Sequence, residues 1–242
     1  MIESRDETEL QRTLTELVGL LPGDESYEQT LQRVVDLARQ TITGCDTASV
    51  TLLSPGPKPA VTVVRTAGLA ERVDQVQYQL DFGPCLDAAR GQRPVEVVSM
   101  RSEERWGPFP GEAIRHGVLS SLSIPLGVRG EPTGALNLYS QGEAAYTEQS
   151  REVGRLFGAQ ASVAIANAQV YEASRKLTEQ MQEALRSRAV IEQAKGILMA
   201  ERGCDEEKAF DLLRAASQRQ NVKLRDVAQR LVDSKGDGPA AP

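Results

Sequence analysis

The feature that most constrains this chain is a segment that runs from Thr147 past residue 199 without a proline. Because proline breaks or kinks the interior of a helix, its absence allows one uninterrupted helix over this length. Apolar residues recur along the segment at seven-residue intervals: Leu156, Val163, Val170, Leu177, Ala184 and Ile191. A sustained heptad predicts a helix that pairs with a second copy of itself as a coiled coil. The companion positions are largely polar, so a helix that lies on its own domain is the alternative: Gln160, Asn167, Ser174 and Met181.

Two amphipathic helices are predicted at the start of the chain. Residues 7–21 carry apolar side chains at three- and four-residue spacing, which is typical of a helix with one buried face. Ser26, followed three residues later by Gln29, forms a capping box and begins the second helix. The buried face of this second helix is expected to carry Leu31, Val34, Val35, Ala38 and Ile42.

Five β-type runs follow, at residues 48–53, 60–66, 94–98, 120–126 and 133–139. Three prolines separate the first two runs, so these two are expected to form a hairpin. Between the second and third runs, residues 67–92 alternate short helical pieces with glycine and proline. This order predicts an α+β domain with an antiparallel sheet. We expect its helices to cover one face and to leave a pocket-like face under the middle segment.

The end of the chain predicts a three-helix unit. Gly203 is placed to end the long helix, and Asp205 is placed to cap the next one. The buried face of that helix is expected to carry Ala209, Phe210, Leu213 and Ala216. A last helix is predicted over residues 223–232, with residues 236–242 as a disordered tail. The buried residues of this last helix are expected to be Leu224, Val227, Ala228 and Leu231.

Charge is unevenly distributed along the chain. The net charge is −6, but Arg175 to Lys235 holds 13 Lys and Arg against 10 Asp and Glu, and the remainder holds 15 against 24. The C-terminal quarter therefore offers a surface that nucleic acid could approach. The chain has no apolar stretch of about 18 residues, and its start lacks the pattern of a signal peptide. Three widely spaced cysteines argue against disulfides or structural zinc, so we expect a cytoplasmic location.

Catalytic patterns are missing from the sequence. His116 is the single histidine, and nothing near it resembles a catalytic motif. No phosphate-binding loop, metal-spaced cluster or pair of carboxylates stands out. We therefore expect no enzymatic activity, predict no catalytic or metal-binding residue, and identify no cofactor.

The C-terminal helices resemble the ANTAR domain. Residues 188–199, with the sequence RAVIEQAKGILM, are similar to its first helix; residues 209–216 and 221–228 are similar to the second and third. The resemblance covers residues 175–233. ANTAR domains bind paired RNA stem-loops in nascent transcripts and so prevent a terminator from forming. Family resemblance thus implies transcription antitermination, and the alternative is a signalling protein whose C-terminal helices dock a protein partner.

Residues 8–170 resemble a GAF sensor domain of the kind that precedes ANTAR in actinobacterial proteins. The similarity is carried by residues 82–89, 104–110, 120–126 and 134–140. We expect a GAF-like sensor domain over 1–150, a helical connector and dimerisation segment over 151–187, and an ANTAR domain over 175–235. The resemblance implies an unknown small molecule or protein as the partner of the GAF domain.

Candidate RNA-binding residues lie beside the predicted core of the ANTAR helices. At about 100° per residue, Arg188 and Lys195 fall on one ridge flanking the apolar stripe, and Arg214 has the same position on the next helix. Arg219 and Lys223 are expected to extend this basic patch. Such side chains supply salt-dependent affinity for phosphates. An ordinary solvated face is the alternative.

Candidate ligand-binding residues of the GAF-like part are Cys85, Trp106 and Phe109. Cys85 lies near the place where GAF pockets open. It is favoured as a small buried apolar residue, with a redox-sensing thiol or a bilin attachment point as alternatives. Trp106 and Phe109 lie in a proline-flanked loop, where they line a small-molecule pocket or anchor the loop on the sheet.

Overall fold

The computed structural model describes residues 12, 15, 26–53, 60–128 and 131–236. The chain divides into two compact units, residues 1–172 and residues 173–242. The helix expected over residues 7–21 lies almost wholly outside the described residues, as does the expected tail. Within the described helices there is no apolar stretch of the length that a bilayer requires.

The first unit is built on a five-stranded antiparallel sheet with the strand order β2-β1-β5-β4-β3. The predicted hairpin is confirmed, since Leu53 pairs with Ala60. The central strands β1 and β5 pair from Thr47 opposite Tyr139 to Leu52 opposite Gly134. The strands are β1 (Thr47–Leu53), β2 (Ala60–Arg65), β3 (Val95–Val97), β4 (Ser120–Val128) and β5 (Glu131–Ser140).

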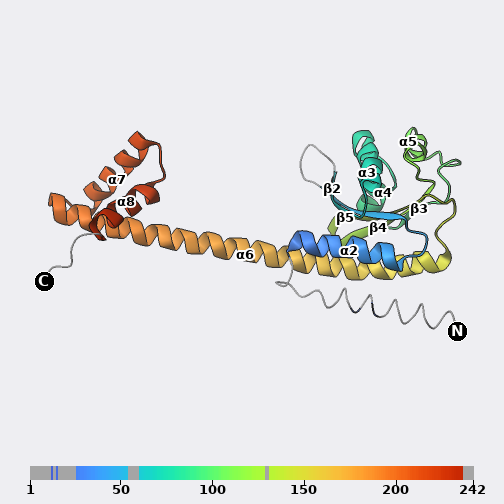
Figure 1. Cartoon of the computed structure of the whole chain (residues 1–242), viewed down its shortest axis with the longest axis horizontal. Coiled ribbons are helices and arrows are strands. Elements are labelled where there is room, and N and C mark those ends of the chain that lie inside the picture. Colours follow the sequence, from blue (N-terminus) through green and yellow to red (C-terminus); the bar gives the residue numbers. More distant parts are fainter. Residues whose placement is uncertain (1–11, 13–14, 16–25, 54–59, 129–130, 237–242) are drawn as a thin grey trace. The chain divides into compact units, whose positions relative to one another are not determined.

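One face of the sheet is covered by α2 (Tyr27–Thr41) and the first part of α6 (Glu148–Arg202) (Figure 1). The capping box at the start of α2 is confirmed: the Gln29 N–H donates to Ser26 Oγ at 3.2 Å, and the Ser26 N–H donates to Gln29 Oε1 at 2.7 Å. Glycine lets α6 approach the sheet closely. A Cβ at Gly158 would lie 2.4 Å from the Ile124 side chain.

Helices also cover the opposite face, which differs from the expected pocket-like face. Residues 67–92 form α3 (Gly68–Leu80) and α4 (Pro84–Gly91), and α5 (Phe109–Arg115) packs beside them. Their apolar side chains form one cluster with Ala135 and Tyr139 of the sheet. The middle segment therefore fills this face with packed side chains, because its short helices are amphipathic.

The second unit contains the end of α6, with α7 (Glu206–Gln220) and α8 (Leu224–Gly236). Gly203 follows α6 with a φ of +61°, and Asp205 accepts from the Lys208 N–H at 2.8 Å, so both predicted boundaries are confirmed. The core of the unit gathers around Ala194, Leu213 and Ala228.

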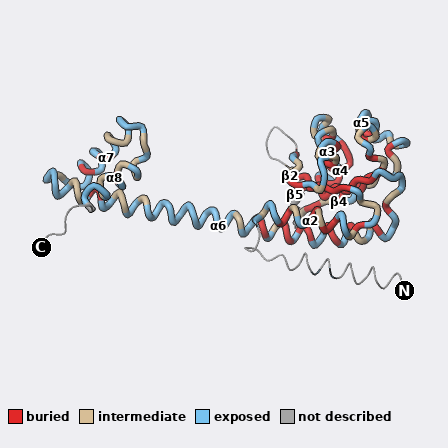
Figure 2. The backbone as a smooth tube through the Cα atoms, in the orientation of Figure 1, coloured by how far each residue is buried: buried red, intermediate tan, exposed pale blue. Residues whose placement is uncertain are grey.

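Two apolar residues lie elsewhere than expected. Phe210, predicted to be buried, is 37% exposed, because it lies at the edge of the face that α7 packs inward. Ile191, the last member of the heptad, packs against the three-helix core instead of facing outward. Figure 2 shows that the part of α6 between the GAF-like fold and this core is exposed.

Candidate nucleic-acid interface and the closed sensor core

Lys195 links two helices of the second unit. Its ammonium lies 2.8 Å from Glu192 Oε2 on α6 and 2.5 Å from Glu206 Oε1 on α7, and its side chain is only 7% exposed. Hydrogen bonds to Glu192 and Glu206 raise the pKa of Lys195 above its ordinary value. The sequence placed Lys195 on an open ridge. In the structure its charge is engaged by carboxylates, because α7 begins directly beside it.

Arg188 and Arg214 are both exposed, and helical spacing relates each of them to the Lys195–Glu206 contact. Arg188 precedes Lys195 by seven residues, which is two helical turns, so it shares the side of α6 that meets the first turn of α7. On α7, Phe210 and Arg214 follow Glu206 at intervals of one turn. We name Arg188, Lys195, Phe210 and Arg214 the α6–α7 edge.

The two exposed arginines of the α6–α7 edge are available to an anionic partner. Within the described chain, Arg188 has no ion pair. Arg214 is 62% exposed and lies 3.5 Å from Asp211, a contact that water weakens. Both side chains can therefore reach a phosphate group without breaking a buried interaction.

Arg219 and Lys223 are exposed but lie away from the α6–α7 edge. Arg219 follows Arg214 by five residues, which turns it roughly 140° around α7. Lys223 lies in the turn between α7 and α8, after Asn221, whose φ of +51° ends α7. The five predicted RNA-binding residues thus form no single patch in this structure.

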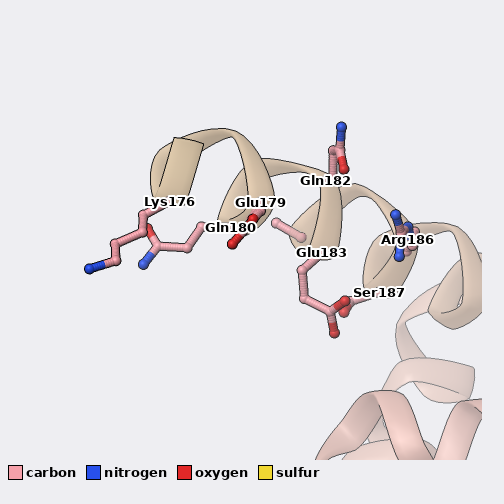
Figure 3. Close-up of a pocket in the computed structure, with 8 residues that line it drawn as sticks. Lys176, Glu179, Gln180, Gln182, Glu183, Arg186 and Ser187 are labelled. Atoms are coloured by element: carbon pink, nitrogen blue, oxygen red, sulfur yellow. The ribbon is translucent and has the colours of Figure 1, made fainter. Parts of the chain in front are cut away.

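The exposed part of α6 carries mixed charges, as the close-up in Figure 3 shows. Its shallow hollow is lined by residues of α6 alone, including Lys176, Glu183 and Arg186. Glu183 also pairs with Arg225 of α8. The large apolar side chains Leu177, Met181 and Leu185 of this part are exposed, which a helix normally avoids unless a partner covers them.

In the first unit, a buried carboxylate joins α3 to the sheet. Asp74 accepts hydrogen bonds from Ser49 Oγ at 2.7 Å, Thr62 Oγ1 at 2.8 Å, Tyr139 Oη at 2.5 Å and Asn137 Nδ2 at 3.2 Å. None of these donors carries a positive charge. Burial raises the pKa of Asp74 to about 6, although the four hydrogen bonds favour its charged form.

The sequence patterns do not predict this polar cluster. Asp74 lies beside Val73 on the buried face of α3, and Asn137 is flanked by Leu136 and Leu138 on a central strand. A polar residue at a core position is the signal that could have found them. Asn137 Oδ1 is buried and has no hydrogen-bond partner among the described residues.

The three candidate ligand residues of the first unit lie inside its core. Cys85 is fully buried, and burial raises the pKa of its thiol well above the ordinary value, so the reactive thiolate is disfavoured. Trp106 donates to Asp87 Oδ2 at 2.9 Å and meets Phe109 edge to face at 6.5 Å between ring centroids. Their geometry is that of a loop anchored on the sheet.

The comparisons with known families divide the chain in the same way. A family model of the GAF domain matches residues 24–166, and a family model of the ANTAR domain matches residues 179–232. The second match includes Arg188, Lys195, Phe210 and Arg214. No curated protein matches the chain.

Solved structures share the fold of the first unit. One is the GAF domain from Acinetobacter phosphoenolpyruvate-protein phosphotransferase, at 22% identity and a TM-score of 0.53, covering 67% of this chain and 93% of that chain. Another is the free methionine-R-sulfoxide reductase from Neisseria meningitidis in complex with its substrate, at 13% identity and a TM-score of 0.51, covering 66% and 87%. These likenesses show the fold alone.

Proposed function

This chain belongs to the GAF–ANTAR regulators, which combine a sensor domain with an RNA-binding antitermination domain, and from that premise we propose that it binds stem-loops in nascent transcripts. Binding would hold the RNA in paired stem-loops and so prevent a terminator from forming. The GAF domain would make this binding depend on a signal. The combination of these two domain types supports a regulator and not an enzyme.

The observation that supports RNA binding most is the α6–α7 edge within the ANTAR match. Arg188 and Arg214 extend from two helices that one core holds together. Two exposed guanidinium groups on a rigid edge suit phosphates, because arginine presents its donors in a planar fork. Lys195 would hold the first turn of α7 against α6 through its contact with Glu206 and so fix the positions of the two arginines.

RNA binding is tested on the full-length chain with RNA selected from a pool of tandem stem-loops with randomised loops. We expect Arg214→Ala to weaken binding and to reduce the salt dependence by about one counterion. Lys208→Ala is the matched control, because Lys208 is exposed on α7 roughly 160° around the helix from Phe210. If the selection yields no RNA that the wild type binds, docking of a protein partner becomes the better explanation.

We also propose a homodimer through α6. Val163 and Val170 are 49% and 71% exposed in the first unit, and Leu177 is 58% exposed in the second. These residues belong to the heptad, so one stripe of the helix is apolar and uncovered. A second copy of the same stripe would cover it as a coiled coil.

A further inference from the structure

We propose that Phe210 is a stacking platform for an unpaired base in the loop of the bound RNA. This inference rests on the proposed function and adds a base contact to the phosphate contacts described above. Sequence-specific recognition of RNA generally targets unpaired loop bases, which stack on aromatic or guanidinium planes. The α6–α7 edge offers one aromatic ring for this purpose.

Phe210 is the single aromatic residue between Ala173 and the end of the chain. The core of the second unit is small and includes only short or aliphatic side chains, with Ala194, Leu213 and Ala228 at its centre. A small core gains more from burying a phenyl ring than from burying alanine. The ring is nevertheless 37% exposed, so part of it is open to a partner.

The neighbours of Phe210 favour a nucleic acid as this partner. Arg214 lies one turn further along α7, and Glu206, one turn earlier, is paired with Lys195 at 2.5 Å. Arg188 contributes a second exposed cation from α6. An aromatic ring with cations nearby suits a base and its phosphates together, whereas an apolar protein surface would offer neither guanidinium group an anion.

Two acidic side chains on this part of α7 oppose this arrangement: Asp211, which lies 3.5 Å from Arg214, and Glu207. Glu207 is exposed three residues before Phe210 and has no ion pair in the part of the chain that the structure describes. Its charge would repel a phosphate that follows a base stacked on Phe210. The inference therefore includes a gain of affinity: Glu207→Gln should strengthen RNA binding.

The test uses the full-length chain and the selected tandem stem-loop RNA. Phe210→Leu should weaken binding by roughly 5- to 150-fold, the range of one stacked base, and Phe210→Trp should restore it. Leu212→Ala is the matched control: Leu212 is 38% exposed on the same helix but lies roughly 160° around it from Phe210. It should leave affinity unchanged. Circular dichroism should show the wild-type helix content in all three variants.

RNAs with a single abasic site in a loop identify the contact. At the stacked position, the abasic RNA should bind wild type and Phe210→Leu equally, because the base that distinguishes them is gone.

Two results would reject stacking while RNA binding stands. In the first, Phe210→Leu binds every abasic RNA more weakly than the wild type does, by the same factor as for the intact RNA. In the second, Phe210→Leu binds the intact RNA as tightly as the wild type does. If Phe210→Leu instead dissociates a dimer in sedimentation, a second copy covers the ring and the inference fails. If the wild type binds no RNA, the proposed function fails first.

Discussion

The ammonium of Lys195 on α6 lies 2.5 Å from Glu206 Oε1 in the first turn of α7. This partly buried contact joins the first turn of α7 to α6 within the ANTAR match. Glu192 completes the arrangement from one turn earlier on α6, with Oε2 at 2.8 Å. The Lys195 side chain is 7% exposed, whereas those of Glu192 and Glu206 are 51% and 71% exposed. Removing Lys195 therefore takes away a buried side chain and leaves two carboxylates without their shared counter-charge.

Replacing Lys195 with alanine should therefore lower thermal stability. The substitution leaves Glu192 and Glu206 close together without a counter-charge, whereas Arg214→Ala removes an exposed side chain. Melting followed by circular dichroism at 222 nm should show a lower melting temperature for Lys195→Ala than for Arg214→Ala. Equal melting temperatures would show that the carboxylates do not depend on Lys195.

The pH dependence of the same contact has a definite sign. Hydrogen bonding from Lys195 lowers the pKa of Glu206 below its ordinary value of 4.5. A lowered pKa stabilises the folded state above the unfolded pKa, and this stabilisation is lost as the pH falls through the folded pKa. The difference in melting temperature between wild type and Lys195→Ala should accordingly shrink below pH 4.5.

The stability of the ANTAR unit should depend more on Leu213 than on Phe210. Leu213→Ala opens a cavity at a residue only 2% exposed and should cost about 2–5 kcal/mol. Phe210→Ala removes a partly exposed ring and should cost less. Denaturation of the full-length variants, followed by circular dichroism, measures both. A larger loss for Phe210→Ala would place its ring in the core, as the sequence had suggested.

The difference between these two residues shows what could be predicted from the sequence. Helix boundaries at Ser26, Gly203 and Asp205 were predictable, because a cap depends on a few neighbouring residues. The sheet followed from the pattern of its strands. Phe210 was assigned to the core because helical periodicity shows which residues share a side, but not how far the packing reaches around the helix.

The candidate sites were less predictable for the same reason. The position of Lys195 beside Arg188 follows from α6 alone, but its burial follows from the place where α7 begins. The partners of Asp74 come from three strands, up to 65 residues away in the sequence. Contacts of this kind are set by tertiary packing, which local patterns do not contain. The burial of Cys85 and Trp106 likewise follows from how α3, α4 and α5 cover the sheet.

Asp74 should make the stability of the GAF domain fall as the pH rises. Its pKa is raised from 3.8 to about 6 by burial, so folding favours the protonated form. The stabilisation is complete below the unfolded pKa and is lost as the pH rises through 6, which amounts to about 3 kcal/mol at pH 7. Asp74→Asn, which cannot ionise, should remove this dependence.

Fluorescence of Trp106 measures this effect in the full-length chain. Trp106 is the single tryptophan and is buried in the GAF core, so its emission reports the unfolding of that domain. Urea denaturation at pH 4.5 and pH 7.5 should show a pH-dependent difference between wild type and Asp74→Asn. Parallel pH profiles for the two proteins would show that the pKa of Asp74 is the same in the folded and unfolded states.

Dimerisation should depend on the exposed heptad of α6. Val163→Glu combined with Val170→Glu places like charges along the stripe and should yield a monomer in sedimentation experiments. Gln182→Glu adds a charge at an exposed position of α6 outside the heptad and should leave the dimer intact. A wild type that is already monomeric at micromolar concentration would contradict the proposed dimer.

Communication from the GAF domain to the ANTAR domain should depend on the rotational phase of α6. Because a helix is stiff, a change at one end can reach the other as a rotation or shift, provided that the signal binds two states with different affinity.

Seven residues inserted between Ser174 and Arg175 preserve the heptad, whereas five residues turn the following helix by roughly 140°. In a cellular terminator-readthrough reporter, we expect the seven-residue insertion to behave like the wild type and the five-residue insertion to lose or lock regulation. Both inserted proteins should keep wild-type affinity for RNA in vitro if the ANTAR domain binds independently of phase. Identical readthrough from the two insertions would show that the phase of α6 does not carry the signal.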